Sequence, residues 1–367
     1  MQLRLPFMKI SRVSKANRQS SLLSILTLGI VLLLSACGGE GGSKPAPDVS
    51  DIDVEVEVIR YDELLSEMDA DKPEHSYLKL VTQHPRITDL YFKELMMLHK
   101  ADTEAFYPDL SAFIAEPRIT ALEDTIAHFY PYDTDLTEGF VLPMKYLKYY
   151  FPDYSLPVFY TLFTEFSYQN FIFENKDNRN GVGIGLDYFL GKDFEYKKID
   201  PGNAVFSSYL SRTYTKEYMV KKATEMVVLD LLGSPPGKRF IDQMIFQGKK
   251  TFILERLMPA TPDTILWEYT TPQMDWIQDN EMEIWSFFLE HELMYETSHL
   301  KIANYLEPAP NSKGMPEAAP GRTGTYIGYK IVDSYMRRNP KASLEDLIQM
   351  RDSQKLLESA RYKPARK

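Results

Sequence analysis

The stretch NGVGIGLDYFLG, residues 180–191, decides how the middle of this chain is interpreted. Its three glycines stand at every second position: Gly181, Gly183 and Gly185. In a β-strand this spacing puts them on one face. A dinucleotide-binding loop would instead read G-x-G-x-x-G at the start of a helix, and Tyr188 stands where its third glycine is required. We therefore predict a strand over residues 182–191, with one face that lacks side chains.

A strand face without side chains lets another backbone approach closely. Such a strand could lie at the edge of a sheet and accept an extended peptide. It could equally be an interior strand that packs against its neighbours. The sequence leaves both interpretations open.

Working outward, residues 156–173 are rich in β-branched and aromatic residues and predict another strand, which a turn over residues 175–181 ends. Residues 51–62 alternate apolar and acidic positions and predict a half-buried strand. Helical patterns cover residues 61–68, 76–84, 89–100, 120–131, 137–153 with a break near Pro143, 215–232, 237–258, 270–290, 293–306, 325–339 and 344–358. The last of these begins with a capping box of Ser343 and Asp346. We predict a predominantly helical α+β domain with a small mixed sheet.

The first 36 residues carry five basic residues and no acidic residue. An apolar run follows the basic residues, from position 22 to position 37. This order is typical of a secretory signal peptide. The run is shorter than the about 20 residues that a membrane-spanning helix needs.

The apolar run ends in Leu34-Ser35-Ala36-Cys37, which resembles the lipobox of bacterial lipoproteins. The resemblance implies an S-diacylglycerol group on Cys37, cleavage before it, and an N-palmitoyl group on the new amine. Two or more acyl chains anchor a protein stably to a membrane. The alternative is an ordinary signal peptide followed by a free thiol. Because Cys37 is the only cysteine, the chain has no disulfide and no other thiol nucleophile.

Composition narrows the range of partners. The 367 residues carry a formal charge of −10, so we expect no nucleic-acid partner. We expect a signal peptide (1–36), a flexible tether (37–50), a globular domain (51–345), and a C-terminal helix with a basic tail (346–367). The predicted location is the bacterial envelope, with a lipid anchor in a membrane and the domain in the periplasm. No cofactor-binding motif is present, so we predict no cofactor.

The segment HELMY, which begins at His291, comes close to the zinc motif H-E-x-x-H. That motif needs a second histidine at i+4, where this chain has Tyr295. Glu292, Glu296 and His299 are spaced at i, i+4 and i+7, so we expect them to share one helix face. The remaining four histidines have no ligand spacing, and no serine lies in G-x-S-x-G. We predict neither a metal site nor a catalytic residue.

Several blocks together resemble the gliding-motility lipoprotein family GldB: residues 185–191, 244–259, 284–299 and 307–340. The block PGRTGTYIGYKIVDSYM, residues 320–336, is the most specific of them. The resemblance extends over most of residues 51–340. It implies an envelope-anchored protein required for gliding and linked to the machinery that moves and secretes surface adhesins. It implies no enzymatic activity.

The family is also distantly similar to zincin-like peptidases, in which a helix carries H-E-x-x-H and a later helix carries Glu-Gly. The matching positions here are Thr224, Glu225 and Val228 on the first helix and Gln247-Gly248 on the second. The resemblance implies that both histidine ligands and the glutamate ligand are lost, and that only the catalytic-base position, Glu225, keeps its residue type. Glu225 could equally be an ordinary residue of a helix surface.

Three functional hypotheses follow. The first is a non-catalytic envelope lipoprotein that holds a protein partner in the former substrate groove. Its candidate groove residues are Gly183, Gly185, Asp187, Glu225, Gln247 and Arg322. The Arg322 guanidinium could bind a carboxylate, or it could form a structural salt bridge. The second hypothesis is a metal-free or peptidase-like hydrolase that uses Asp187 and Glu225 as acid and base. The third is a structural spacer in an envelope complex.

Overall fold

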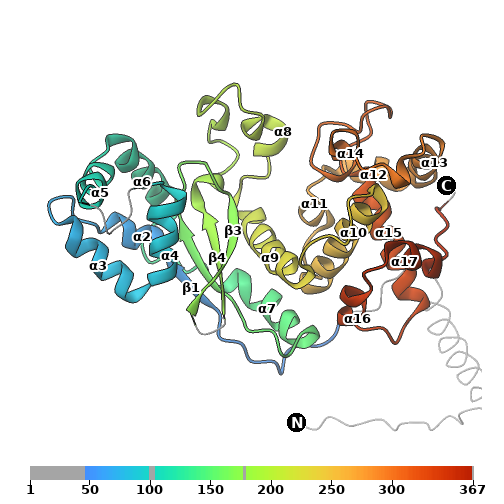
Figure 1. Ribbon diagram of the computed structural model, residues 1–367, viewed down its shortest axis with the longest axis horizontal. Coiled ribbons are helices and arrows are strands. Elements are labelled where there is room, and N and C mark those ends of the chain that lie inside the picture. The colour runs from blue at the N-terminus through green and yellow to red at the C-terminus, as the bar shows by residue number, and fades with distance from the viewer. Residues whose placement is uncertain (1–45, 99–103, 177–178, 366–367) are drawn as a thin grey trace, which may run out of the picture. The chain divides into compact units, whose positions relative to one another are not determined.

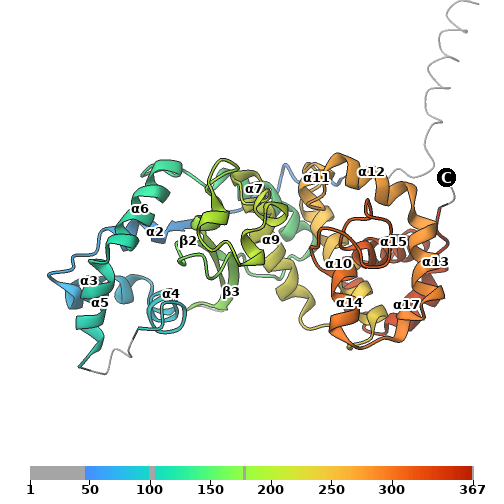
Figure 2. The ribbon, with the colours of Figure 1, turned by 90° about the horizontal axis from the view of Figure 1, so that it is seen from above.

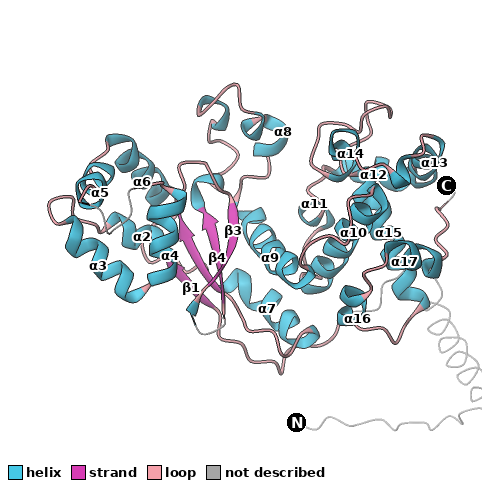
Figure 3. Ribbon diagram, in the orientation of Figure 1, coloured by secondary structure: helices cyan, strands magenta, loops and turns pink. Residues whose placement is uncertain are grey.

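Among the residues that the computed structural model describes (46–98, 104–176 and 179–365), the strands form a single four-stranded sheet. The strands are β1 (Glu57–Arg60), β2 (Val158–Leu162), β3 (Asn170–Glu174) and β4 (Asn180–Gly185). Helices dominate the rest of these residues (Figure 3). The predicted helical α+β class with a small mixed sheet is confirmed.

The strand order is β1-β2-β4-β3. β4 pairs in parallel with β2 and antiparallel with β3, so it lies inside the sheet. The interpretation of β4 as an edge that accepts a peptide is therefore wrong. The predicted strand over 156–173 is two strands, β2 and β3. The predicted strand over 182–191 ends at Gly185, where a 3₁₀ turn (Leu186–Tyr188) begins.

The glycines of β4 make room for aromatic rings of β3. Gly183 is paired with Phe171 in the register, and Gly181 with Phe173. A Cβ atom at Gly183 would lie 2.1 Å from the Phe171 ring, and one at Gly181 would lie 2.2 Å from the Phe173 ring. The face that the sequence shows as bare is thus filled by cross-strand aromatic side chains.

Helices lie on both sides of the sheet (Figure 1). The chain after β1 forms α2 (Tyr61–Ser66), α3 (Pro73–Gln83), α4 (Pro85–Asp89), a π-helix (Leu90–Leu95), α5 (Phe106–Ile114) and α6 (Pro117–Phe129). On the other side, α7 (Glu138–Tyr150) precedes β2, and α9 (Lys216–Leu232) contacts β3 and β4. The short helix α8 (Ser208–Ser211) comes before α9.

Proline does not break α7, contrary to the sequence prediction. Pro143 lies inside the continuous helix Glu138–Tyr150. A proline removes one backbone hydrogen bond, but Phe140, Met144 and Leu147 are fully buried on the same helix. Tertiary packing of this apolar face holds the helix together.

The remaining helices form the C-terminal third of the chain (Figure 2). They are α10 (Phe240–Leu257), α11 (Asp263–Leu266), α12 (Thr271–Asp279), α13 (Glu281–Glu290), α14 (His299–Leu306), α15 (Thr323–Arg338), α16 (Leu344–Gln349) and α17 (Ser353–Ala360). The capping box of Ser343 and Asp346 is confirmed at the start of α16. The predicted helices over 270–290 and 344–358 are each two helices.

The helices α10 and α15 pack together more extensively than any other helix pair in the described ranges. Two glycines permit this approach. A Cβ atom at Gly248 would lie 2.2 Å from the Gly328 carbonyl carbon, and one at Gly328 would lie 1.9 Å from the Met244 carbonyl oxygen. Any larger residue would force the helices apart, so this contact fixes where the side chains of α10 lie relative to the start of α15.

Candidate functional site

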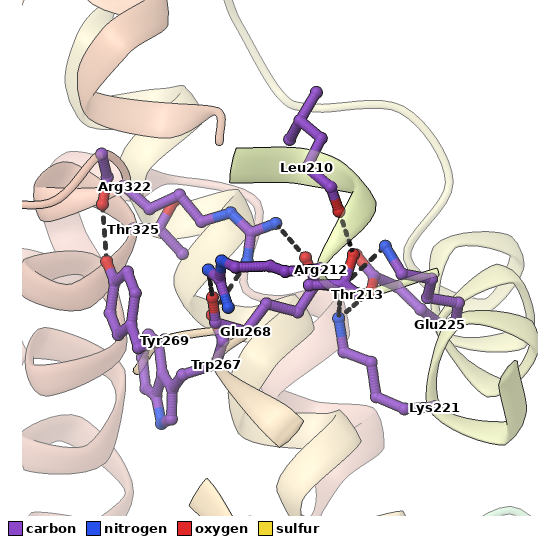
Figure 4. Close-up of polar contacts among 12 residues, drawn as sticks. Leu210, Arg212, Thr213, Lys221, Glu225, Trp267, Glu268, Tyr269, Arg322 and Thr325 are labelled. Atoms are coloured by element: carbon purple, nitrogen blue, oxygen red, sulfur yellow. Dashed lines mark hydrogen bonds and ion pairs between the residues drawn. The ribbon is translucent and has the colours of Figure 1, made fainter. Parts of the chain in front are cut away.

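Six charged side chains meet between α9, α10 and the start of α15. We call them the charge cluster: Lys221, Lys222, Glu225, Lys250, Glu268 and Arg322. The first three come from α9 and Lys250 from α10, while Glu268 follows α11 and Arg322 is the N-cap of α15. Figure 4 shows Glu268 between Lys221 and Arg322.

The two glutamates bridge the cations. Lys221 Nζ lies 2.6 Å from Glu225 Oε2 and 2.8 Å from Glu268 Oε1. The Glu268 carboxylate also forms salt bridges with Lys222 Nζ at 3.1 Å and with Arg322 Nη2 at 2.7 Å. The other carboxylate oxygen of Glu225, Oε1, forms a salt bridge with Lys250 Nζ. Each carboxylate is therefore shared by at least two cations.

Hydrogen bonds to backbone carbonyls hold two members of the cluster in place, Glu268 and Arg322. Arg322 Nη1 donates to the Trp267 carbonyl at 3.0 Å, and the Arg212 guanidinium donates to the Glu268 carbonyl. Glu268 and Arg322 both have left-handed backbone conformations, with φ of 53° and 63°. Such conformations in residues other than glycine are strained and persist only where the surroundings fix them. The salt bridge between these two residues therefore joins two strained positions.

Burial and the neighbouring cations shift the pKa values of Glu225 and Glu268 in opposite directions. Burial alone would raise the pKa of Glu268, but Lys221, Arg322 and Lys222 outweigh it and hold that pKa well below its usual value. For Glu225, burial likewise opposes Lys221 and Lys250, and the pKa is again lowered. Both carboxylates are therefore ionised at neutral pH.

The pKa values of the three lysines do not all shift in the same direction. Burial lowers the pKa of Lys250 and of Lys222, and the single carboxylate that each contacts does not restore it. Lys221 contacts both carboxylates, which outweigh its burial and raise its pKa. The cluster thus combines four cationic side chains with two carboxylates.

A small cavity of about 20 Å³ opens beside the cluster. Its polar lining consists of Lys221, Glu225, Gln247, Lys250, Thr251, Arg322 and Thr325. Both threonine hydroxyls already donate to backbone carbonyls of Gln247 and Leu306. In the described ranges, the Gln247 side-chain amide makes no hydrogen bond.

Asp187 belongs to a different site. Its side chain is fully buried, and its Oδ2 accepts the backbone N–H of Thr164 at 3.0 Å and of Phe166 at 2.6 Å. These contacts hold a turn in which Glu165 and Phe166 are both left-handed, with φ of 50° and 60°. Burial raises the pKa of Asp187 to about 6, although the hydrogen bonds favour its ionised form. We call Asp187 with residues 164–166 the aspartate clip.

The structure brings together only half of the predicted groove residues. Glu225, Gln247 and Arg322 line the same cavity. Gly183 makes room for the Phe171 ring of β3. A Cβ atom at Gly185 would meet the Tyr168 carbonyl at 2.5 Å and Asp187 Oδ1 at 2.9 Å, so this glycine serves packing beside the clip. Asp187 and Glu225 bond to separate partners, and the acid–base pair of the hydrolase hypothesis is not assembled. Arg322 forms a salt bridge within the chain, as the second interpretation proposed.

Sequence reasoning missed Lys221, Lys222, Lys250 and Glu268. One signal was present: α10 is apolar on most sides, and most of its residues are buried. Lysines inside such a helix must find an acid or a carbonyl, because an unpaired buried charge is costly. Glu225 lies four residues after Lys221 on α9, which places it on the same helix face.

The HELMY segment does not continue a helix. α13 ends at Glu290, and Glu292 is left-handed with φ of 54°. The His291 ring stacks on Phe287 with 4.0 Å between centroids, and His299 pairs with Glu307. The face that Glu292, Glu296 and His299 were expected to share is therefore not formed. No group of three or more His, Cys, Asp or Glu side chains in the described part of the chain could hold a metal ion.

The two positions aligned with histidine ligands lie in the interior of α9. Thr224 and Val228 are fully buried, and the Thr224 hydroxyl donates to the Val220 carbonyl. In the Gln247-Gly248 pair, the glycine permits the crossing of α10 and α15.

A family model described as "Gliding motility protein GldB" matches residues 42–364. This match covers most of the chain, so the chain belongs to the GldB family, as its sequence blocks predicted. No curated protein and no solved structure matches the chain. The zincin-like scaffold therefore stays a prediction. Across residues 46–98, 104–176 and 179–365, no helix is both long enough and apolar enough to cross a membrane. Cys37 and the signal peptide lie outside the described residues.

Proposed function

We propose that this member of a gliding motility lipoprotein family is a non-catalytic protein of the bacterial envelope. It would support gliding or adhesin secretion by holding a protein partner at the charge cluster. Family membership and the lipobox at Cys37 support an envelope role. In this proposal the lipid anchors the chain to a membrane, and the domain faces the periplasm.

The paired state of Glu225 supports the non-catalytic part of the proposal. A general base must accept a proton near the working pH. Lys221 and Lys250 lower the pKa of Glu225, which makes its carboxylate a weak base. The excess positive charge around Glu225 also opposes the approach of a divalent metal ion. The position where a peptidase would need its base is thus occupied by salt bridges.

Two variants separate binding from catalysis in a strain that lacks the chromosomal gene. Glu225→Gln removes a base but leaves the shape of the cavity almost unchanged, so gliding and adhesin secretion should persist. Gln247→Trp fills the cavity without changing charge, and both processes should fail at a normal protein level. Leu300→Trp on the exposed face of α14 is the matched control, since Leu300 is 88% exposed.

The opposite pattern would overturn the proposal. If Glu225→Gln abolished gliding in a folded protein while Gln247→Trp preserved it, Glu225 would act in catalysis. The anchor has its own test: Cys37→Ser should abolish the incorporation of labelled palmitate and release the protein from membranes. Retained label in that variant would contradict lipidation at Cys37.

A further inference from the structure

The charge cluster contains more positive charge than its two carboxylates can balance. Lys221, Lys222, Lys250 and Arg322 contribute four positive charges, and Glu225 and Glu268 contribute two negative ones. Arg212 adds a further cation at the backbone of Glu268. In a protein with a formal charge of −10, such a concentration of positive charge at largely shielded positions needs an explanation.

Hydrogen-bond donors are also in excess. Each lysine ammonium has three N–H donors and each arginine guanidinium has five. Within the described part of the chain, Lys250 and Lys222 each contact one carboxylate oxygen. The Gln247 amide lines the same cavity and has no hydrogen-bond partner there. Donors on Lys250 and Gln247, both on α10, therefore remain available at the cavity.

The walls of the cavity strengthen any charge interaction inside it. Leu254, Leu266, Trp267 and Leu306 form its apolar lining. Apolar walls lower the local dielectric, so an anion between the cations would be held more strongly than at an open surface.

We infer that the charge cluster is a carboxylate-binding site. One carboxylate oxygen would enter the cavity beside Lys221, Lys250 and Arg322 and accept a hydrogen bond from Gln247. The cavity volume of about 20 Å³ admits little more than one water-sized atom. A flat carboxylate can insert one oxygen there and leave one outside, whereas phosphate or sulfate that inserts one oxygen must place three more at the mouth of the cavity.

The carboxylate could come from a small organic acid or from a polypeptide, as a C-terminus or an acidic side chain. The polypeptide source rests on the proposed function, and the small-acid source does not. Calorimetric titration of the full chain in detergent distinguishes them with sodium acetate, a short peptide with a free C-terminus, and the same peptide with an amidated C-terminus. Sodium chloride at equal ionic strength and sodium phosphate are the comparison anions.

We expect saturable binding of acetate, with chloride and phosphate at least about 10-fold weaker, since hydrogen bonds to charged groups contribute this much discrimination. If the peptide with a free C-terminus binds more tightly than acetate, and if amidation abolishes its binding, the carboxylate comes from a polypeptide. Binding of acetate without binding of either peptide assigns the small acid, whereas equal binding of the free and the amidated peptide would overturn the carboxylate site. Equal responses to acetate, chloride and phosphate would overturn the carboxylate site.

Two neighbouring lysines on α10 provide a matched pair of variants. Lys250→Met removes a cation that lines the cavity and should weaken acetate binding at least about 10-fold. Lys249→Met is the control, because Lys249 Nζ donates to the Met350 carbonyl at 2.6 Å, away from the cavity. Lys250→Arg keeps the charge and should retain binding. Unchanged acetate affinity in Lys250→Met would overturn the inference. A loss of gliding in Gln247→Trp without any acetate binding by the wild type would support the proposed function alone.

Discussion

The aspartate clip and the charge cluster are both built on buried carboxylates, but they are neutralised in different ways. Asp187 accepts two backbone N–H groups from the turn that it stabilises. Glu225 and Glu268 instead accept hydrogen bonds from lysine and arginine side chains, which come from the same helix in the Lys221–Glu225 pair and from other segments in the remaining pairs. At the clip, the backbone donors are paired with the Asp187 carboxylate. The charge cluster, in contrast, has more hydrogen-bond donors and more cationic side chains than its two carboxylates can pair.

On our proposal, this difference separates a structural site from a site that binds a ligand. A carboxylate satisfied by the adjacent backbone fixes a loop and has little capacity left for a ligand. A cluster with unmatched charge costs stability in the empty protein and gains stability when an anion binds. Functional sites often retain such a cost. The effects of substitutions on the free energy of unfolding should therefore differ between the two sites in magnitude and in pH dependence, and in one case in sign.

The largest effect is expected at Glu268, which contacts three cations. Glu268→Ala should lower the free energy of unfolding by about 3–5 kcal/mol, because it leaves buried charges without their partner. Chemical denaturation followed by tryptophan fluorescence measures this change. A loss below about 1 kcal/mol would mean that water replaces the carboxylate and that the cluster is not truly buried.

At the clip, Asp187→Ala should cost about 2–4 kcal/mol, since two buried N–H groups lose their acceptor. Asp187→Asn keeps an oxygen acceptor for both N–H groups and should cost much less. Denaturation of the two variants in parallel tests this. Equal losses for Ala and Asn would show that the negative charge, and not the hydrogen bonding, holds the turn at residues 164–166.

The clip should also make stability depend on pH in the mildly acidic range. The pKa of Asp187 is raised to about 6 in the folded protein by burial, against about 3.9 in an unfolded chain. The folded state therefore holds a proton that the unfolded state releases between these values. The contribution of Asp187 to the free energy of unfolding is full below about pH 4 and falls by roughly 3 kcal/mol as pH rises through about 6.

Asp187→Asn removes the titrating group and serves as the control for that measurement. Subtracting its denaturation profile from that of the wild type isolates the contribution of Asp187. A difference curve that is flat between about pH 4 and pH 6 would contradict the raised pKa.

The smallest expected effect has the opposite sign. Lys222→Met removes one surplus cation whose pKa burial already lowers. Without a bound anion, this variant should be more stable than the wild type by about 1 kcal/mol. Thermal unfolding in acetate-free buffer measures it, with Lys216→Met at the start of α9 as a control for the loss of a lysine. A destabilised Lys222→Met protein would show that Glu268 needs all three of its cations.

Features that depend on a few neighbouring residues were predictable from the sequence. The Ser343 capping box starts α16, and the alternating glycines of β4 lie in a strand, because both patterns depend on local backbone geometry. The extent of local structure was less predictable. Pro143 was expected to break α7, but packing preserved that helix. Residues 293–298 were expected to be helical, but they contain only a 3₁₀ turn after the left-handed Glu292, and α14 begins only at His299.

The sequence by itself determined the helical α+β class, the family, and a candidate site that includes Glu225, Gln247 and Arg322. Only the tertiary structure decided that β4 is an interior strand, that Asp187 belongs to a separate clip, and that lysines surround Glu225. The physical reason is distance along the chain. Local patterns arise from contacts within about one helical turn, whereas Lys221 and Glu268 are 47 residues apart and meet only after α9 and α10 have packed.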